Sequence, residues 1–289
     1  YLIFALRYFL KYKIVLWSFG YDYETGFNPQ NSLKDLIRLK YYQKADAVIF
    51  YWEKGKEEIE KYSKTKEHYF VAPNTINTDI LVKYKNDFDK LGKGSIKKHL
   101  KVFADFHFVF VGRLIPDKEV LLLLKAVKLL ENSGYNFRVT IIGDGCEINV
   151  LKKYVNENGL DNVYFLGEIL DQYDVSKWIY ISDAFILPGR LGNSVVQSFC
   201  LGVPIVSQEK EGHFHGEGIG YIKNNINSLL CSEGDVVDLK NKMEFIILNP
   251  EYSTELGKKA YKTVTVEAST ERFIEGFEEA INYVSASKY

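Results

Sequence analysis

The sequence predicts an α/β fold in which parallel sheets are covered by helices. Its apolar, β-rich segments are continuous rather than alternating, a pattern typical of strands that are buried on both faces. These segments alternate with helical stretches along almost the whole chain, as they do in doubly wound folds. The expected strands span residues 13–19, 46–52, 68–72, 106–112, 137–143, 162–167, 183–188 and 203–207.

Helices are expected between these strands. Clear examples are residues 32–44 and 118–134, and Gly134 suits the end of the second because glycine accepts the left-handed conformation that often closes a helix. After about residue 233 the strand pattern stops, and three helices are expected, the last of them STERFIEGFEEAINYV.

The chain is long enough for about two domains, at 289 residues with 46% hydrophobic content. Residues 86–102 are polar and lysine-rich, and we predict that they link two α/β units, the first of them incomplete. Because Tyr1 leads straight into a helix and a strand, we expect the amino-terminal part of a longer protein to be missing. The expected division is 1–100 for the first unit with its linker, 101–265 for the second unit and 266–289 for a terminal helix.

Charge and cysteine content exclude some classes of protein. The 37 basic residues nearly balance the 38 acidic ones, so no nucleic-acid partner is expected. Cys146, Cys200 and Cys231 are odd in number and widely spaced, and we expect three buried, reduced thiols in a cytoplasmic protein.

The opening segment YLIFALRYFLKYKIVLW is apolar but is interrupted by Arg7, Lys11 and Lys13. No uncharged run reaches the roughly 18–20 residues that a membrane-spanning helix needs. We predict a helix that leads into a buried strand. The alternative for this aromatic and basic segment is a peripheral contact with the inner face of a membrane.

In open α/β sheets the ligand lies beyond the carboxyl ends of the strands, so the segments after the strands are candidate sites. Gly112, Arg113 and Lys118 follow the strand at 106–112. A fixed guanidinium and an ammonium at a helix start form a suitable cradle for a diphosphate. The alternative is a pair of solvated charges beside a turn, and the position after a strand favours phosphate binding.

The next two segments are less specific. Gly143 and Gly145 bracket a tight turn, and Asp144 and Glu147 are expected as favourable acids in the first turn of the helix that follows. Gly167 would let the backbone approach a flat group such as a nucleobase. The following residue, Glu168, is either part of that site or a surface charge.

The segment LPGRLGNSVVQSFCLGVPIV at 187–206 has the form of a ligand loop, although Arg190 is its only charged residue. Farther along, His213 and His215 lie in a glycine-rich loop. Two histidines without an evident third ligand rarely bind a metal, so we expect loop or substrate contacts there. The sequence has no HExxH, P-loop or GxSxG element.

Taken in order, FVGRLIPDK, IIGDG, NVYFLGEI, SDAFILPG and GVPIVS resemble the retaining glycosyltransferases of family 4. Upstream, KADAVIFYWEKGKEEI and YFVAPNTINTDIL resemble the end of that family's amino-terminal domain, so the resemblance extends from about Lys13 onward. It implies the GT-B architecture of two Rossmann-like domains with parallel sheets, the first incomplete here, and a terminal helix that crosses back to the first domain.

The resemblance implies transfer of a sugar from a nucleotide-sugar donor to a glycan or lipid-linked acceptor, with retention and without a metal or other cofactor. Arg113 and Lys118 match the catalytic pair that binds the diphosphate and stabilises the leaving nucleotide. Gly167 matches the approach to the base. The donor-binding residues expected are Gly112, Gly143, Gly145, Gly167, Glu168, Gly189, Arg190, Gly192, Asn193, Ser194 and Gln197.

The chain also departs from the family pattern. Aligned on Gly202–Val203–Pro204, the two positions that usually hold glutamates are Gly189 and Gln197. Gln197 can still hydrogen-bond a ribose hydroxyl, whereas Gly189 offers only backbone, and Arg190 or Asn193 would supply polar contacts instead. Glu119 also stands where the family usually has glycine.

Two alternatives to a transferase therefore remain at this stage. One is a homologue that binds a nucleotide or glycan without turnover. The other is a GT-B epimerase that acts on nucleotide-sugars. The presence of both Arg113 and Lys118 favours the transferase, because a protein without catalytic activity would have little need of both cations.

Overall fold

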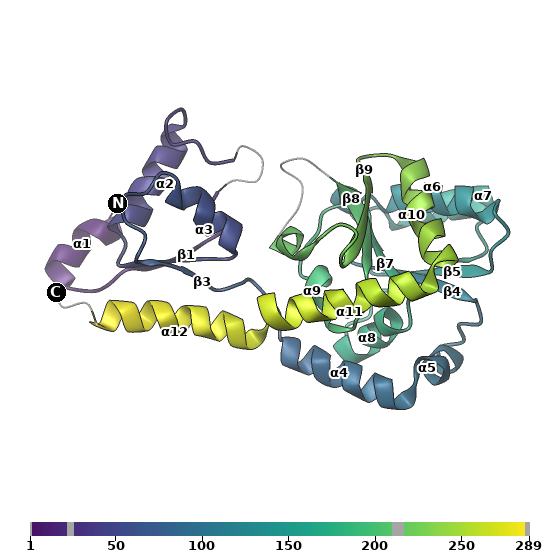
Figure 1. Cartoon of the computed structure of the whole chain (residues 1–289). Coiled ribbons are helices and arrows are strands. Elements are labelled where there is room, and N and C mark those ends of the chain that lie inside the picture. Colours follow the sequence, from purple (N-terminus) through teal and green to yellow (C-terminus); the bar gives the residue numbers. More distant parts are fainter. Residues whose placement is uncertain (1, 22–25, 210–216, 287–289) are drawn as a thin grey trace. The chain divides into compact units, whose positions relative to one another are not determined.

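The computed structural model describes residues 2–21, 26–209 and 217–286, and it divides into two compact units (Figure 1). Unit 1 consists of Tyr1–Thr75 and Glu267–Tyr289, and unit 2 of Ile76–Val266. Each unit has its own parallel sheet, as the continuous apolar strands predict.

Unit 1 contains, among its described residues, a parallel sheet of order β1-β2-β3. Its elements are α1 (Leu2–Leu10), β1 (Val15–Ser18), α2 (Leu33–Lys44), β2 (Ala47–Phe50), α3 (Glu53–Glu60), β3 (Tyr69–Val71) and α12 (Thr270–Ala286). The central strand β2 is fully buried, whereas β1 alternates exposed and half-buried residues, so the expectation of a buried strand there is wrong. An edge strand lacks a neighbour on one side, which leaves residues such as Trp17 exposed.

The terminal helix α12 belongs to unit 1, where it packs against β2 and β3. Gly276 allows this close approach, because a Cβ at that position would lie 2.2 Å from the carbonyl oxygen of Val71. The first unit is therefore built from both ends of the chain.

Unit 2 contains a parallel sheet of order β6-β5-β4-β7-β8-β9 in the described part of the chain. The strands are β4 (Phe106–Val111), β5 (Phe137–Ile142), β6 (Val163–Gly167), β7 (Ala184–Leu187), β8 (Ile205–Glu209) and β9 (Ser228–Ser232). The helices are α4 (Thr78–Leu91), α5 (Lys93–His99), α6 (Val120–Glu131), α7 (Ile148–Asn158), α8 (Gln172–Tyr180), α9 (Ser194–Cys200), α10 (Val236–Leu248) and α11 (Pro250–Glu267).

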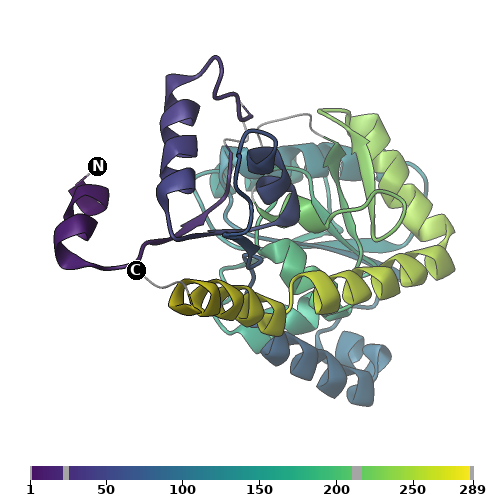
Figure 2. The same ribbon diagram turned by 60° about the vertical axis from the view of Figure 1, so that its left-hand side comes forward.

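The two faces of this sheet are covered by different helices. Helices α6, α7 and α10 pack together on one face, and α4, α8 and α9 pack together on the other (Figures 1 and 2). The middle strands β4 and β7 pair directly and are almost wholly buried. Strand order reverses between them, and such a switch point is where ligands bind in open α/β sheets.

Two segments differ from the expectations. Residues 86–102, expected as a linker, form the end of α4 and all of α5, and they belong to unit 2. Gly92, with φ +79°, ends the first of these helices and leads into the second, so it joins two helices rather than loosening the chain. Strand β9 was not expected, because only three apolar residues lie between its polar ends.

Candidate functional site

The loops after β4, β5 and β6 lie against one another at the carboxyl edge of the unit 2 sheet. The Leu114 N–H donates to the Asp144 carbonyl at 2.8 Å, and the Gly143 N–H donates to the Gly167 carbonyl at 2.8 Å. These bonds extend the sheet pairing beyond the strands and fix the three loops as one surface.

Two glycines make this surface possible. Gly143 has φ +136°, and a Cβ there would lie 2.0 Å from the Gly112 carbonyl oxygen. A Cβ at Gly145 would lie 2.3 Å from the Leu114 carbonyl oxygen. The GDG segment is therefore a close contact between neighbouring loops, and only glycine fits at either position.

Three cations gather at this edge, and we call Arg113, Lys118 and Arg190 the cation cluster. Lys118 ends the 3-10 turn Pro116–Lys118, and its Nζ donates to the Arg190 carbonyl. Burial lowers the pKa of the Lys118 ammonium, and the positive charges of Arg113 and Arg190 lower it further. Like charges held together in this way form a strong site for an anion.

The lowered pKa of Lys118 predicts how anion binding changes with pH. Only the protonated ammonium attracts an anion such as a diphosphate, so affinity for such an anion should fall as the pH rises toward 10.5, earlier than for an ordinary lysine. The free energy of unfolding of the ligand-free protein should instead rise with pH. This follows because a lysine whose pKa is lower in the folded than in the unfolded state loses its proton first in the folded state. Titrating anion affinity against pH tests this, and Arg190→Ala should move the fall to higher pH. A fall at the same pH in both proteins would contradict the coupling.

The loop after β7 packs directly on the turn that carries Lys118. The Arg190 N–H donates to the Asp117 carbonyl at 2.7 Å. Gly189 is buried, and a Cβ there would lie 2.2 Å from the Asp117 carbonyl oxygen and 2.5 Å from the Lys118 Cα. This position therefore has no room for any side chain.

The remaining expected residues after β7 surround the start of α9. Gly192 has an open surrounding, Asn193 is the exposed N-cap residue, and Ser194 opens the helix. Gln197 lies one turn farther along and is half-buried. Their backbone continues from Arg190, so this turn lies next to the cation cluster in the chain.

Gly167 and Glu168 lie at the end of β6, the edge strand of the sheet. Gly167 has φ +72° and an open surrounding, and its carbonyl accepts from Gly143. Glu168 is exposed. The structure thus joins Gly167 to the same loop surface through Gly143.

Glu119 and Gln208 are joined at this same edge, although the sequence marked Glu119 only as a departure from the family's glycine and did not mark Gln208. Gln208, expected in a loop, is the fourth residue of β8 and is 0% exposed. Its side-chain amide nitrogen donates both to Glu119 Oε2 and to the Pro188 carbonyl, and its Oε1 accepts from the Gly234 N–H. The apolar run ends at Val206, and no pattern in the sequence distinguishes Gln208 from the polar residues around it.

Three smaller expectations require correction. Asp144 and Glu147 precede α7 rather than lie in its first turn, and the Asp144 carboxylate accepts from the Gly145 N–H at 2.7 Å. Glu147 is the N-cap residue of that helix. Cys146 is exposed, whereas Cys200 and Cys231 are buried as expected, and all three are free thiols.

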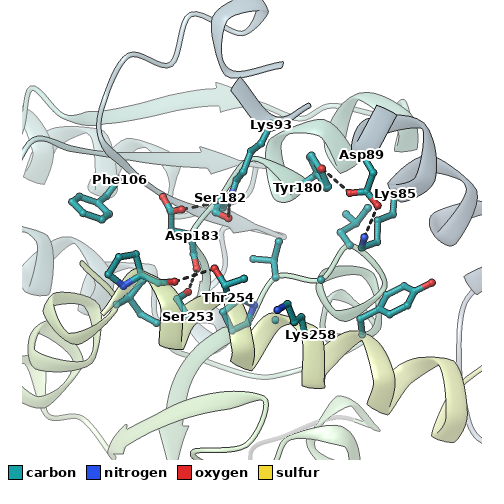
Figure 3. A pocket seen from close by; sticks show the side chains of 18 residues that line it. Lys85, Asp89, Lys93, Phe106, Tyr180, Ser182, Asp183, Ser253, Thr254 and Lys258 are labelled. Carbon is teal, nitrogen blue, oxygen red and sulfur yellow. Dashed lines mark hydrogen bonds and ion pairs between the residues drawn. The ribbon is translucent and has the colours of Figure 1, made fainter. Parts of the chain in front are cut away.

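A pocket of about 370 Å³ lies at the opposite, amino-terminal edge of the same sheet (Figure 3). Its charges are mutually paired: Lys85 contacts Asp89 at 2.7 Å, and Lys93 contacts Asp183 at 3.4 Å. Lys258 pairs outside the pocket lining with Glu255 at 2.6 Å. This pocket therefore lacks the concentration of like charge that marks the carboxyl edge.

Within residues 2–21, 26–209 and 217–286, no three His, Cys, Asp or Glu side chains are grouped so as to hold a metal ion. His213 and His215 lie outside these residues. Over the same residues, every helix is too short or too polar to cross a membrane.

The family model and the similar curated proteins all describe glycosyltransferases. Residues 94–263 match the family described as Glycosyl transferases group 1. An uncharacterized glycosyltransferase of Methanocaldococcus jannaschii is 26% identical over 253 residues, which cover 84% of this chain and 57% of the relative. The capsular polysaccharide biosynthesis glycosyltransferase CapM of Staphylococcus aureus is 22% identical over 207 residues, 69% of this chain and 51% of CapM. The chain thus spans little more than half the length of these relatives.

Solved structures share the fold. HepE of Anabaena in complex with UDP superposes with a TM-score of 0.72 at 16% identity, covering 96% of this chain and 74% of HepE. Sucrose-phosphate synthase of Thermosynechococcus elongatus gives a TM-score of 0.69 at 18% identity, with 98% and 72% covered. These likenesses confirm the GT-B fold of two Rossmann-like units with parallel sheets.

Proposed function

The chain belongs to the glycosyl transferases group 1, and from this premise we propose that it transfers a sugar from a nucleotide-sugar donor to a glycan or lipid-linked acceptor. The proposal includes retention at the anomeric carbon, as in family 4, and independence of a divalent metal. The observation that carries it is the cation cluster at the switch point of the unit 2 sheet.

The cation cluster fits the electrostatics of sugar transfer. When the bond between the anomeric carbon and the diphosphate oxygen breaks, negative charge develops on the departing diphosphate. In this proposal Lys118, whose Nζ donates to the Arg190 carbonyl, and the nearby Arg113 face that position and stabilise the charge. Backbone N–H groups of the loop after β7, other than that of Arg190, supply further donors.

The space at Gly189 bears on the route of the reaction. A route through a covalent glycosyl-enzyme needs a nucleophilic side chain next to the anomeric carbon. Gly189 has none, and its packing against Asp117 leaves no room for one. We therefore favour direct departure of the diphosphate: the bond from the anomeric carbon to the diphosphate oxygen breaks, the acceptor oxygen bonds to the same face of the sugar, and the departing diphosphate takes the acceptor's proton.

The comparisons suggest which donors and acceptors to test first. HepE has been solved with UDP and with UDP-glucose, so uridine donors lead the list. CapM is described as a glycosyltransferase of capsular polysaccharide biosynthesis, which supports a glycan acceptor. A lipid-linked acceptor at the inner face of the membrane is part of the proposal. The free thiols of Cys200 and Cys231 suit the cytoplasm.

A thermal-shift titration against UDP, GDP, ADP and CMP, each free and as a sugar conjugate, tests the proposal. A ligand at about 100 times its Kd adds about 2.7 kcal/mol to the folded state, which raises the melting temperature measurably. We expect one base to give a saturable shift. A cooperatively melting protein that no nucleotide stabilises would contradict the proposal.

Metal independence is a separate prediction. Because lysine and arginine supply the positive charge at the diphosphate, transfer measured by release of the nucleoside diphosphate should keep its rate in excess EDTA. Adding Mg²⁺ or Mn²⁺ after the chelator should leave the rate within about twofold. A rate that disappears in EDTA and returns with one metal would show that a cation is required.

The missing acid at Gly189 favours one alternative, a homologue that binds the donor without turnover. Transfer and donor hydrolysis distinguish the two. Saturable binding of a nucleotide-sugar with neither reaction, across a broad panel of acceptors, would support the binding protein.

A further inference from the structure

We propose that Glu119, held in place by Gln208, binds hydroxyl groups of the donor sugar and supplies the carboxylate that Gly189 lacks. This inference rests on the proposed function, because it assigns a role within the nucleotide-sugar site. Glu119 is then a sugar-binding residue and Gln208 a positioning residue.

The backbone of Glu119 is the first observation. Its φ of 50° and ψ of 37° lie in the left-handed region, which glycine adopts readily and other residues adopt at a cost. The turn after Lys118 would form more easily with glycine. A glutamate in this strained conformation, directly after Lys118 of the cation cluster, points to a use for its side chain.

The contacts of Gln208 are the second observation. One amide nitrogen of a side chain that is 0% exposed bonds both Glu119 Oε2 and the Pro188 carbonyl. The Glu119 carboxylate oxygen and the carbonyl oxygen of Pro188, the residue before Gly189, therefore accept hydrogen bonds from the same nitrogen atom. Gln208 therefore links the Glu119 carboxylate to the β7 loop, although the two loops are far apart in sequence.

The orientation of Gln208 is itself fixed. Its Oε1 accepts from the Gly234 N–H, so the amide nitrogen must face Glu119 and Pro188. This buried amide can only donate from that nitrogen, and a carboxylate is the stronger acceptor. Gln208 thus donates to the Glu119 carboxylate and ties it to the β7 loop.

The charges on this turn match the two halves of a nucleotide-sugar. Lys118 presents a cation for the diphosphate, and the next residue presents an anion that accepts hydrogen bonds from hydroxyls. Other nearby acids are placed differently: Asp117 is exposed, and the Asp144 carboxylate accepts from the Gly145 N–H. Glu119 is the acid tied to the β7 loop through Gln208.

The test compares affinity for a nucleoside diphosphate with affinity for its sugar conjugate, using UDP and UDP-glucose or the pair selected by thermal shift. Glu119→Gly should stay folded, because glycine relieves the left-handed strain and so offsets the loss of the hydrogen bond from Gln208. Affinity for the diphosphate alone should stay within about twofold. Affinity for the conjugate should fall about 10- to 100-fold, the loss expected for hydrogen bonds to a charged group.

Gln208→Glu tests the positioning role by its pH profile. It keeps the acceptor for Gly234 but sets a second carboxylate against Glu119, so the two groups would share a proton and the pKa of the pair would rise. The affinity of Gln208→Glu for the sugar conjugate should be weak at pH 8 and should recover in part at pH 5.5. The wild type should not gain affinity for the conjugate between pH 8 and pH 5.5. An unfolded variant would instead lose diphosphate binding at both pH values.

The outcomes separate the two proposals. If the wild type binds no nucleotide, the proposed function fails and this inference fails with it. If the wild type binds both ligands and Glu119→Gly binds both equally well, the proposed function stands and the role of Glu119 is refuted.

Discussion

We expect the double variant Arg113→Ala, Lys118→Ala to lose sugar transfer by about a thousandfold or more. Removing one preorganised donor to a developing negative charge typically costs about 10²- to 10³-fold, and this variant removes two groups of the cation cluster. The fold should persist, because Arg113 is exposed and the Lys118 side chain lies over the loop surface rather than in the core. Release of the nucleoside diphosphate measures transfer, and circular dichroism measures the fold.

A matched control removes two lysines of the same unit away from the carboxyl edge. Lys90 and Lys258 are 78% and 68% exposed, and each pairs only with a carboxylate of its own helix in the described structure. Lys90→Ala with Lys258→Ala should leave transfer within about twofold, because exposed pairs of this kind contribute little. Equal losses in both double variants would show that the effect is not specific to the cation cluster.

We expect Gly189→Glu to abolish transfer rather than improve it, although family resemblance alone would suggest that restoring the acid helps. A Cβ at this position would lie 2.2 Å from the Asp117 carbonyl oxygen and 2.4 Å from the Lys118 carbonyl carbon. Neither backbone group can move without displacing the turn that carries Lys118. Overpacking of this kind destabilises proteins by about 1–3 kcal/mol, so both the melting temperature and the transfer rate should fall.

Gly192→Ala is the control on the same loop. An added Cβ there would meet no described atom within 4 Å, so stability and transfer should stay near wild type. A Gly189→Glu protein with full stability and faster transfer would mean that the β7 loop and the Lys118 turn separate easily. The close packing described here would then not constrain the site.

Much of the fold follows from the sequence because buried parallel strands leave a strong signal. The segment FHFVFV at 106–111, in which five of six residues are apolar, is typical of a strand that helices cover on both faces. The sequence pattern is misleading where glycine and charged residues are interspersed with apolar ones. Gly92 and several lysines at 86–102 imitate a linker, yet Phe88 and Ile96 are buried and anchor two helices.

The site could be predicted only in part. Arg113 and Lys118 follow a recognisable strand, and the rule that ligands bind at the carboxyl edge directs attention to them. The pairing of Glu119 with Gln208 joins residues 89 positions apart, and no local pattern encodes it. The obstruction at Gly189 is likewise a contact between two loops, which a single sequence cannot reveal.

The most direct measurement is a crystal structure of the chain with the nucleotide-sugar that the thermal-shift panel selects. We expect the diphosphate beside Lys118, Arg113 and Arg190, with the sugar hydroxyls toward Glu119. A donor bound instead in the pocket at the amino-terminal edge, among Lys85, Lys93 and Tyr180, would contradict the assignment of the carboxyl edge as the donor site.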